Sequence, residues 1–177
     1  MEEYTTEAVV LAKHESGEAD TVITLYTRAL GKVRAIARSS RKITSKLAGH
    51  LEPSSLVTVR LARRKMFHVA DALMSRRFPN AERILAFLAH HTEHGADERT
   101  WNVLMDTLEA NEREERMHIG SLLQTLGYDP AFAACATCGI TPTQYVTAAN
   151  LDFYCGPCAD RIGTRTPAEF LSVAEAV

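Results

Sequence analysis

Residues 79–177 contain no lysine, although they make up more than half of the 177-residue chain. They hold 6 Arg against 14 Asp and Glu, a net charge of −8. Residues 1–78 hold 14 Lys and Arg against 8 Asp and Glu, a net charge of +6. This asymmetry predicts a basic module suited to a polyanionic partner, followed by an acidic module with a different task.

The sequence also lacks the common catalytic signatures. It has no G-x-S-x-G nucleophile motif, no P-loop, no dinucleotide fingerprint and no H-E-x-x-H zinc motif. Single Ser, His and Asp residues occur without a recognisable catalytic arrangement. We therefore expect a protein that is not an enzyme.

Long hydrophobic runs are absent as well. The uncharged segment Pro130–Leu151 contains two prolines and several threonines, which make it too polar to span a bilayer. The N-terminus carries Glu2 and Glu3 and has no basic region before an apolar core, so no signal peptide is predicted. We expect no membrane association and a cytoplasmic protein, whose four cysteines stay reduced.

The basic module shows the two-residue periodicity of β-strands. Five segments rich in β-branched and aromatic residues are separated by turn signals, and a short helix is expected within residues 39–50. The predicted strands are Tyr4–His14, Thr21–Thr27, the strand that begins at Gly31, Ser55–Leu61 and Met66–Met74. This layout predicts an α+β protein whose residues 1–78 form a five-stranded OB-fold barrel.

The stretch Gly31–Pro53 carries the densest positive charge. Val33, Ala35 and Ala37 alternate with a cationic face, and no acidic residue follows until Glu52. Strand-edge protection by basic residues would explain part of this pattern. A nucleic-acid backbone explains more of it. The predicted phosphate-binding residues are Lys32, Arg34, Arg38, Arg41, Lys42, Lys46, Arg63, Arg64 and Lys65.

From Asn80 the hydrophobic period changes from 2 to 3.6, which predicts a helical domain over residues 79–177. Four amphipathic segments are expected, the third ending near Gly127. The last is predicted as a helix reaching Val177, opened by a capping box at Thr166–Glu169. Each apolar face is too narrow to be stable alone, so the helices must pack on other elements.

All four cysteines fall in two C-x2-C pairs, at Cys135, Cys138, Cys155 and Cys158. This spacing predicts a structural Zn²⁺ site, because two such turns complete a tetrahedron of thiolates and leave no position for water. A redox dithiol, an iron–sulfur cluster and unrelated buried thiols are the alternatives. His90 and His94 could share a metal at i, i+4 spacing, but favourable charge at a helix C-terminus is the simpler explanation for the histidines there.

The order of these features resembles one known family. The motifs E-A-V-V-L, G-E-A-D and T-L-Y-T-R precede the block Gly31–Pro53, and helices carrying the four-cysteine module follow. Together they resemble the RecO family of bacterial recombination mediators, densely over residues 4–75 and again at Cys135–Cys158. The sequence departs from the family at Ser39, where Gly is usual, and it looks shorter in the helical region.

The resemblance implies a non-enzymatic protein of DNA damage repair and DNA recombination at the bacterial nucleoid. Such proteins bind single- and double-stranded DNA, anneal complementary strands, and work with RecR to load RecA onto DNA coated by single-strand-binding protein. Some members also hold the acidic tail of single-strand-binding protein with basic residues of the helical domain. The resemblance places DNA contacts on the basic barrel surface and zinc on the four cysteines.

Two alternatives stay open from the sequence. A zinc-stabilised adaptor could use the same barrel to bind an acidic protein, and an OB-fold protein could bind RNA instead of DNA. Tyr26 and Phe67 are available for base stacking, although both are more often core residues. Because no element suits a major groove, we expect little sequence preference.

Overall fold

The computed structural model describes residues 2–43, 45–92, 95–110, 112–163 and 170–173. The chain forms two compact units, Met1–Glu98 and Arg99–Val177, and each is described here by itself. The strands of the barrel end at Arg77 and the first helix begins at Glu82, and this helix belongs to the N-terminal unit. Within the described part of the chain, none of the helices combines the length and apolarity needed to cross a bilayer.

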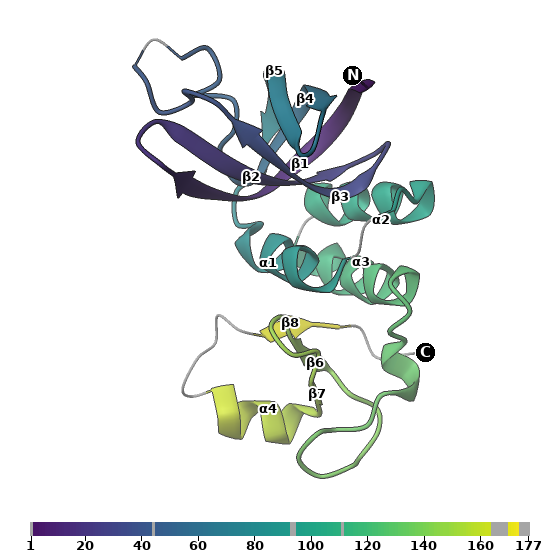
Figure 1. Cartoon of the computed structure of the whole chain (residues 1–177). Coiled ribbons are helices and arrows are strands. Elements are labelled where there is room, and N and C mark those ends of the chain that lie inside the picture. Colours follow the sequence, from purple (N-terminus) through teal and green to yellow (C-terminus); the bar gives the residue numbers. More distant parts are fainter. Residues whose placement is uncertain (1, 44, 93–94, 111, 164–169, 174–177) are drawn as a thin grey trace. The chain divides into compact units, whose positions relative to one another are not determined.

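The N-terminal unit contains the predicted five-stranded barrel, whose strands are purple to teal in Figure 1. Its strands are β1 (Glu2–Ser16), β2 (Asp20–Thr27), β3 (Gly31–Ala37), β4 (Ser55–Arg63) and β5 (Phe67–Arg77). The barrel closes in the order β1-β2-β3-β5-β4, which confirms the predicted fold class. All strand pairs are antiparallel except β3–β5, which is parallel and joined by only two residue pairs.

The side chains of β3 alternate between the barrel core and the surface, as the sequence indicates. Val33, Ala35 and Ala37 are buried in the barrel core, and Arg34 is exposed on the other face. β1 is long enough to serve two neighbours, because Glu2–Val9 pairs with β4 and Ala8–Ser16 pairs with β2. One strand thus connects both halves of the barrel.

The predicted helix within residues 39–50 is wrong, since the described residues there form a series of turns. Short-range bonds such as Lys42 N to Ser39 O (3.2 Å) and Ser45 N to Lys42 O (2.9 Å) hold them. Ser39 adopts a left-handed φ of 52°. A short segment rich in Ser, with Gly49 near its end, gains too few helical hydrogen bonds to offset the cost of nucleation. Leu51 anchors the connection in the barrel core.

Helix α1 (Glu82–His91) lies against β1 in the N-terminal unit. Ile84, Leu85, Phe87 and Leu88 are its buried residues, which fit the predicted 3.6-residue period. A second close approach joins Gly31, at the β2–β3 turn, to Gly95. A Cβ atom at Gly31 would lie 1.9 Å from the Gly95 carbonyl oxygen, so only glycine fits there.

The C-terminal unit combines helices with a small sheet. Helices α2 (Glu98–Glu109) and α3 (Glu112–Thr125) lead through the 3₁₀ turn η1 (Pro130–Phe132) into the segment with the cysteines. Strands β6 (Tyr145–Thr147), β7 (Phe153–Tyr154) and β8 (Phe170–Ser172) pair in the order β7-β6-β8, and α4 (Gly156–Gly163) follows β7. The end of α3 and Gly127, with a φ of 87°, agree with the predicted stop.

The predicted last helix is wrong where the structure describes it, because Phe170–Ser172 forms the strand β8. This strand pairs with β6, and the Phe170 ring contacts the rings of Tyr145 and Tyr154 edge-on. Phe170, Leu171 and Val173 are all buried, a spacing that fits an apolar helix face as well as a strand. A short apolar run fits a buried strand as well as a helix, so periodicity alone was misleading. The predicted capping box at Thr166–Glu169 lies outside the described residues.

Candidate nucleic-acid interface and metal centre

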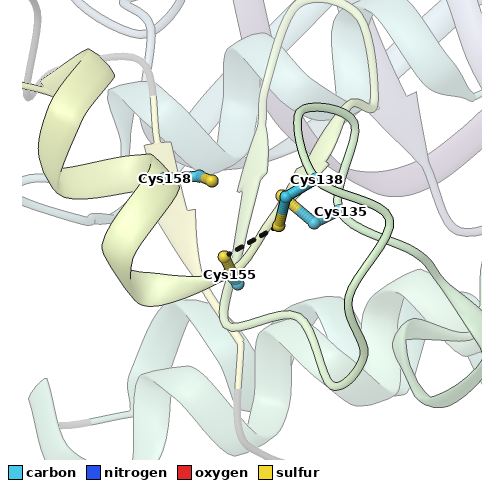
Figure 2. A group of neighbouring side chains, drawn as sticks. All are labelled: Cys135, Cys138, Cys155 and Cys158. Atoms are coloured by element: carbon cyan, nitrogen blue, oxygen red, sulfur yellow. Dashed lines mark hydrogen bonds between the residues drawn. The ribbon is translucent and has the colours of Figure 1, made fainter.

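The four cysteines meet in the C-terminal unit (Figure 2). Cys135 and Cys138 lie in the loop after η1, Cys155 directly follows β7, and Cys158 lies in the first turn of α4. All four Sγ atoms lie within 4.8 Å of one another, and those of Cys138 and Cys155 are 3.6 Å apart. The spacing of the two pairs in the sequence therefore predicted one cluster.

Local hydrogen bonds shape both cysteine pairs. In the first pair, Gly139 N donates to Cys135 O (2.8 Å) and Cys135 N donates to Ile140 O (3.0 Å), which closes a turn at Gly139 with φ 72°. In the second pair, Ala159 N donates to Cys155 O (2.9 Å) as α4 begins. A bond from Ala136 N to Phe153 O (2.8 Å) ties the first turn to β7. The pairs thus approach each other through backbone contacts.

The sulfur geometry fits a tetrahedral metal. A tetrahedral zinc with bonds of about 2.3 Å places its sulfur ligands about 3.8 Å apart. The distance of 3.6 Å between Cys138 and Cys155, and the 4.8 Å limit for the cluster, lie close to that value. Four thiolates and no oxygen ligand are typical of a structural site.

The thiols respond to their surroundings in opposite ways. A backbone hydrogen bond from Cys155 is the chief cause that lowers the pKa of Cys135 to about 6. Burial is the chief cause that raises the pKa of Cys158 to about 12. Cys135 therefore ionises more readily than an ordinary thiol, whereas Cys158 resists ionisation. A divalent cation would remove that resistance, because it stabilises the ionised sulfur atoms.

Arg161 is a contact that the sequence analysis missed. Its Nη2 donates to Cys158 Sγ at 3.5 Å, and its Nε donates to Pro157 O at 3.1 Å. A guanidinium beside a tetrathiolate site offsets part of its negative charge. The i, i+3 spacing of Cys158 and Arg161 on one helix was the available signal.

The predicted phosphate-binding residues all lie in the N-terminal unit, in three groups. The first is the outer face of β3, the second is the β3–β4 connection, and the third is the β4–β5 turn. Six of the nine side chains are exposed and make no ion pair or hydrogen bond with the part of the chain that the structure describes. These six are Arg34, Arg38, Lys42, Lys46, Arg64 and Lys65.

Lys32 differs from the other residues of this set. It is half-buried, and its Nζ donates to the carbonyl oxygen of Ala89 at 3.0 Å. Ala89 lies in the last turn of α1, where a cation is favoured by the helix dipole. Lys32 therefore joins β3 to α1 in addition to contributing positive charge.

Arg41 has an acidic partner that the local sequence did not indicate. Its Nη1 lies 2.7 Å from a carboxylate oxygen of Glu15, which comes from the end of β1. The sequence shows no acidic residue near Arg41, but the β1–β2 turn brings one across the barrel. The ion pair is exposed, so bulk water screens it and Arg41 remains available to a phosphate.

The β4–β5 turn lies beside β3. The register pairs Ala35 with Phe67, so the turn that precedes Phe67 is adjacent to the segment around Arg34. Arg63, the last residue of β4, lies 3.9 Å from Glu2, and its guanidinium lies over the Phe67 ring at 5.5 Å from the ring centroid. Arg64 and Lys65 are exposed beside it. The cations of the turn and of β3 therefore lie along the seam of the barrel, which is the line where β3 pairs with β5.

The other candidate residues fit structural roles. Tyr26 is 3% exposed, so its ring is not available for stacking. Phe67 is half-buried and packs edge-on against Tyr4. His90 Nδ1 lies 2.7 Å from Ala86 O, and no metal cluster includes a histidine among the described residues. His94 lies outside those residues.

Known proteins are similar in sequence to this chain over most of its length. A family model described as "Recombination protein O N terminal" matches residues 1–78. The DNA repair protein RecO of Roseiflexus sp. (strain RS-1) is 32% identical over 162 residues, which cover 80% of this chain and 56% of that protein. RecO of Geobacter sulfurreducens is 31% identical over 158 residues, 76% of this chain and 63% of the relative.

The chain covers a larger share of a third relative. RecO of Dehalococcoides mccartyi (strain 195) is 30% identical over 177 residues, which cover 88% of this chain and 70% of that protein. The chain nevertheless spans only 56% and 61% of the lengths of two other relatives that it matches.

Proposed function

Because the chain belongs to the RecO family of DNA repair proteins, we propose that its barrel binds the sugar–phosphate backbone of single- and double-stranded DNA. The observation that carries this proposal is the group of six exposed cations without partners among the described residues. Two other cations of the predicted set, Arg41 and Arg63, have acidic neighbours. The six cations on β3 and the two loops have no such partner in the described part of the chain, so their positive charge can attract an external polyanion.

The geometry supports contact along a backbone more than reading of bases. Arg34 projects from the outer face of β3, and Arg38 follows directly after the last residue of that strand. The β4–β5 turn extends this row across the seam, and the β3–β4 connection extends it past the end of β3. Contacts of this kind position a strand without reading its sequence.

Strand annealing follows from the same surface. A protein that neutralises the phosphates of two strands lowers their mutual repulsion, while bases that remain exposed can pair. We propose that the protein acts by binding and annealing DNA and does not change it chemically. On the basis of the resemblance to RecO, we further propose that it works with RecR to load RecA onto DNA covered by single-strand-binding protein, at the bacterial nucleoid.

The C-terminal unit has a supporting role in this proposal. We propose that Cys135, Cys138, Cys155 and Cys158 hold a structural Zn²⁺, supported by their mutual distances and by the purely thiolate ligand set. The ion, when bound, fixes the two turns and the sheet between them. It would take no part in a reaction, because four protein ligands leave no open position.

The test compares two charge reversals of equal size. Arg34→Glu/Arg38→Glu changes the proposed surface, and the control Arg76→Glu/Arg77→Glu makes the same change in net charge at the end of β5. We expect the first variant to lower the affinity for single and double strands at least tenfold, measured by fluorescence anisotropy. The slope of log affinity against log salt for single strands should become shallower by about 1.4, the value expected when two phosphate contacts are lost.

Annealing of two complementary labelled strands should slow in parallel with the loss of affinity. Equal losses in the two variants would mean that net charge alone attracts DNA, and the proposed surface would be wrong. Tighter binding of RNA than of DNA of equal length would favour the RNA alternative. A wild-type protein that binds neither would refute the function.

A further inference from the structure

A groove of about 590 Å³ lies within the N-terminal unit, between α1 and the outer faces of β1, β2 and β3. Leu11 and Ala12 of β1 form part of it, and Leu85, Ala86 and Ala89 of α1 face them. Its volume falls within the range of small-molecule sites. This groove could not be predicted from the sequence, because α1 and β1 are far apart in the chain.

One side of the groove is cationic. Arg34 lines it and makes no ion pair or hydrogen bond with any described residue, and Lys32 lines it near the end of α1. Glu82 is the only carboxylate among the described lining residues. The groove therefore combines an apolar wall with positive charge, which suits a ligand that is flat and apolar at one end and anionic at the other.

Two hydroxyl groups in the lining are also unused. Ser54 is 5% exposed and has a left-handed φ of 67°, and Thr24 pairs with Arg34 across β2 and β3. Neither hydroxyl makes a hydrogen bond with the described residues. A hydroxyl that is not used within the protein can donate and accept hydrogen bonds, so both groups are available to a ligand or to water.

Resting on the DNA binding proposed above, we infer that this groove takes one unstacked nucleobase of a bound single strand. Arg34 belongs both to the groove and to the exposed row of cations, so a strand that follows Arg34 and Arg38 passes the mouth of the groove. A nucleotide has the required chemistry, with a flat base for the apolar wall and a phosphate for Arg34. The hydroxyls of Thr24 and Ser54 offer hydrogen bonds to the base edge.

This arrangement separates single strands from duplexes. The bases of a duplex are paired and stacked, so none can enter the groove unless its pairing and stacking are first broken. The backbone contacts of Arg38 and the loops serve both kinds of DNA equally. The groove therefore increases the affinity for single strands and not for duplexes. When a bound strand pairs with its complement, its base leaves the groove, and the duplex that forms is released more easily.

The test fills the groove without changing any charge. Ala86→Phe places a ring in the groove from α1, and the control Ala70→Phe makes the same substitution at an exposed position of β5. We expect Ala86→Phe to weaken single-strand binding roughly five- to tenfold, the lower part of the range for one base contact, and to leave duplex binding within about twofold. Ala70→Phe should change neither.

A second measurement does not depend on whether the variant folds. Wild-type protein should bind a strand of abasic sites more weakly than the same strand with bases, by roughly the same factor. An unchanged affinity of Ala86→Phe for single strands, or equal wild-type affinity for abasic and normal strands, would overturn the inference. Both results are compatible with DNA binding by the cations, so only a wild-type protein that binds no DNA would refute the proposed function as well.

Discussion

The two units of this protein are stabilised by different means. In the N-terminal unit, five strands of seven to fifteen residues enclose one continuous apolar core. In the segment that carries the cysteines, the strands have only two or three residues, and three of the four cysteines form a small buried cluster against which Tyr154 packs. Short elements bury too little apolar surface to fold alone. The comparison indicates that the barrel depends on packing, and it agrees with the proposal that a metal stabilises the cysteine module.

Removal of the metal should have the largest effect and should be confined to one unit. We expect Cys155→Ser, or treatment with a strong chelator, to unfold residues 135–163, because the proposed metal binding of about 10–16 kcal/mol is then lost. The barrel should keep its protection in hydrogen exchange measured peptide by peptide. Loss of protection in β1–β5 would show that the units do not fold separately. Addition of Zn²⁺ to the chelated protein is the control for reversibility.

The next largest effect should come from Gly31→Ala in the barrel. The new methyl group would meet the Gly95 backbone, and φ at this residue is 67°. Overlap and left-handed strain together should lower the free energy of unfolding by about 3 kcal/mol or more. Gly17→Ala is the matched control, with φ of 62° and no atom within 4 Å of the new Cβ, and should cost about 1 kcal/mol.

Denaturant titration followed by hydrogen exchange in the barrel peptides measures this difference. Equal destabilisation by the two alanines would mean that the contact between Gly31 and Gly95 does not exist in solution. Unfolding of the cysteine module together with the barrel in Gly31→Ala would break the proposed independence of the two units.

The smallest effect should come from an exposed ion pair. Arg28 binds Glu98 with two nitrogen atoms and also lies 3.3 Å from Glu7. The hydrogen bond to Arg28 lowers the pKa of Glu98. The pair therefore stabilises the fold above the unfolded-state pKa, about 4.3, and this contribution disappears as the pH falls through the lower folded pKa.

Glu98→Gln should change the protection of the β2–β3 turn by less than about fivefold at pH 7, because water screens exposed pairs. Wild type and variant should become equal in acid. A difference that persists at pH 2 would show that the amide acts through packing and that the ion pair is not its cause.

The features predicted correctly from the sequence are those that local pattern determines. The strands could be predicted because alternation in segments such as Val33–Ala37 has a single interpretation. The cysteine cluster could be predicted because spacing alone brings the two turns together. The errors at residues 39–50 and Phe170–Ser172 have the opposite cause. Short segments fit more than one element, and the partner strand β6 that decides the outcome is distant in the chain.

The candidate site shows the same limit. The sequence predicted which residues carry positive charge, but not that Lys32 is held by Ala89 or that Arg41 meets Glu15. Nor could it predict the groove, which requires α1 to lie against β1. Charge is a local property of a sequence, whereas pairing of charges depends on the tertiary fold.

The long first strand has a practical consequence for work with this protein. Because Glu2 pairs with Arg63, any residues fused ahead of β1 would emerge next to the cationic β4–β5 turn. An affinity tag at that end would therefore compete with polynucleotides, or attract them if it is basic. The DNA affinity measured with such a fusion would therefore include an effect of the tag in addition to that of the barrel.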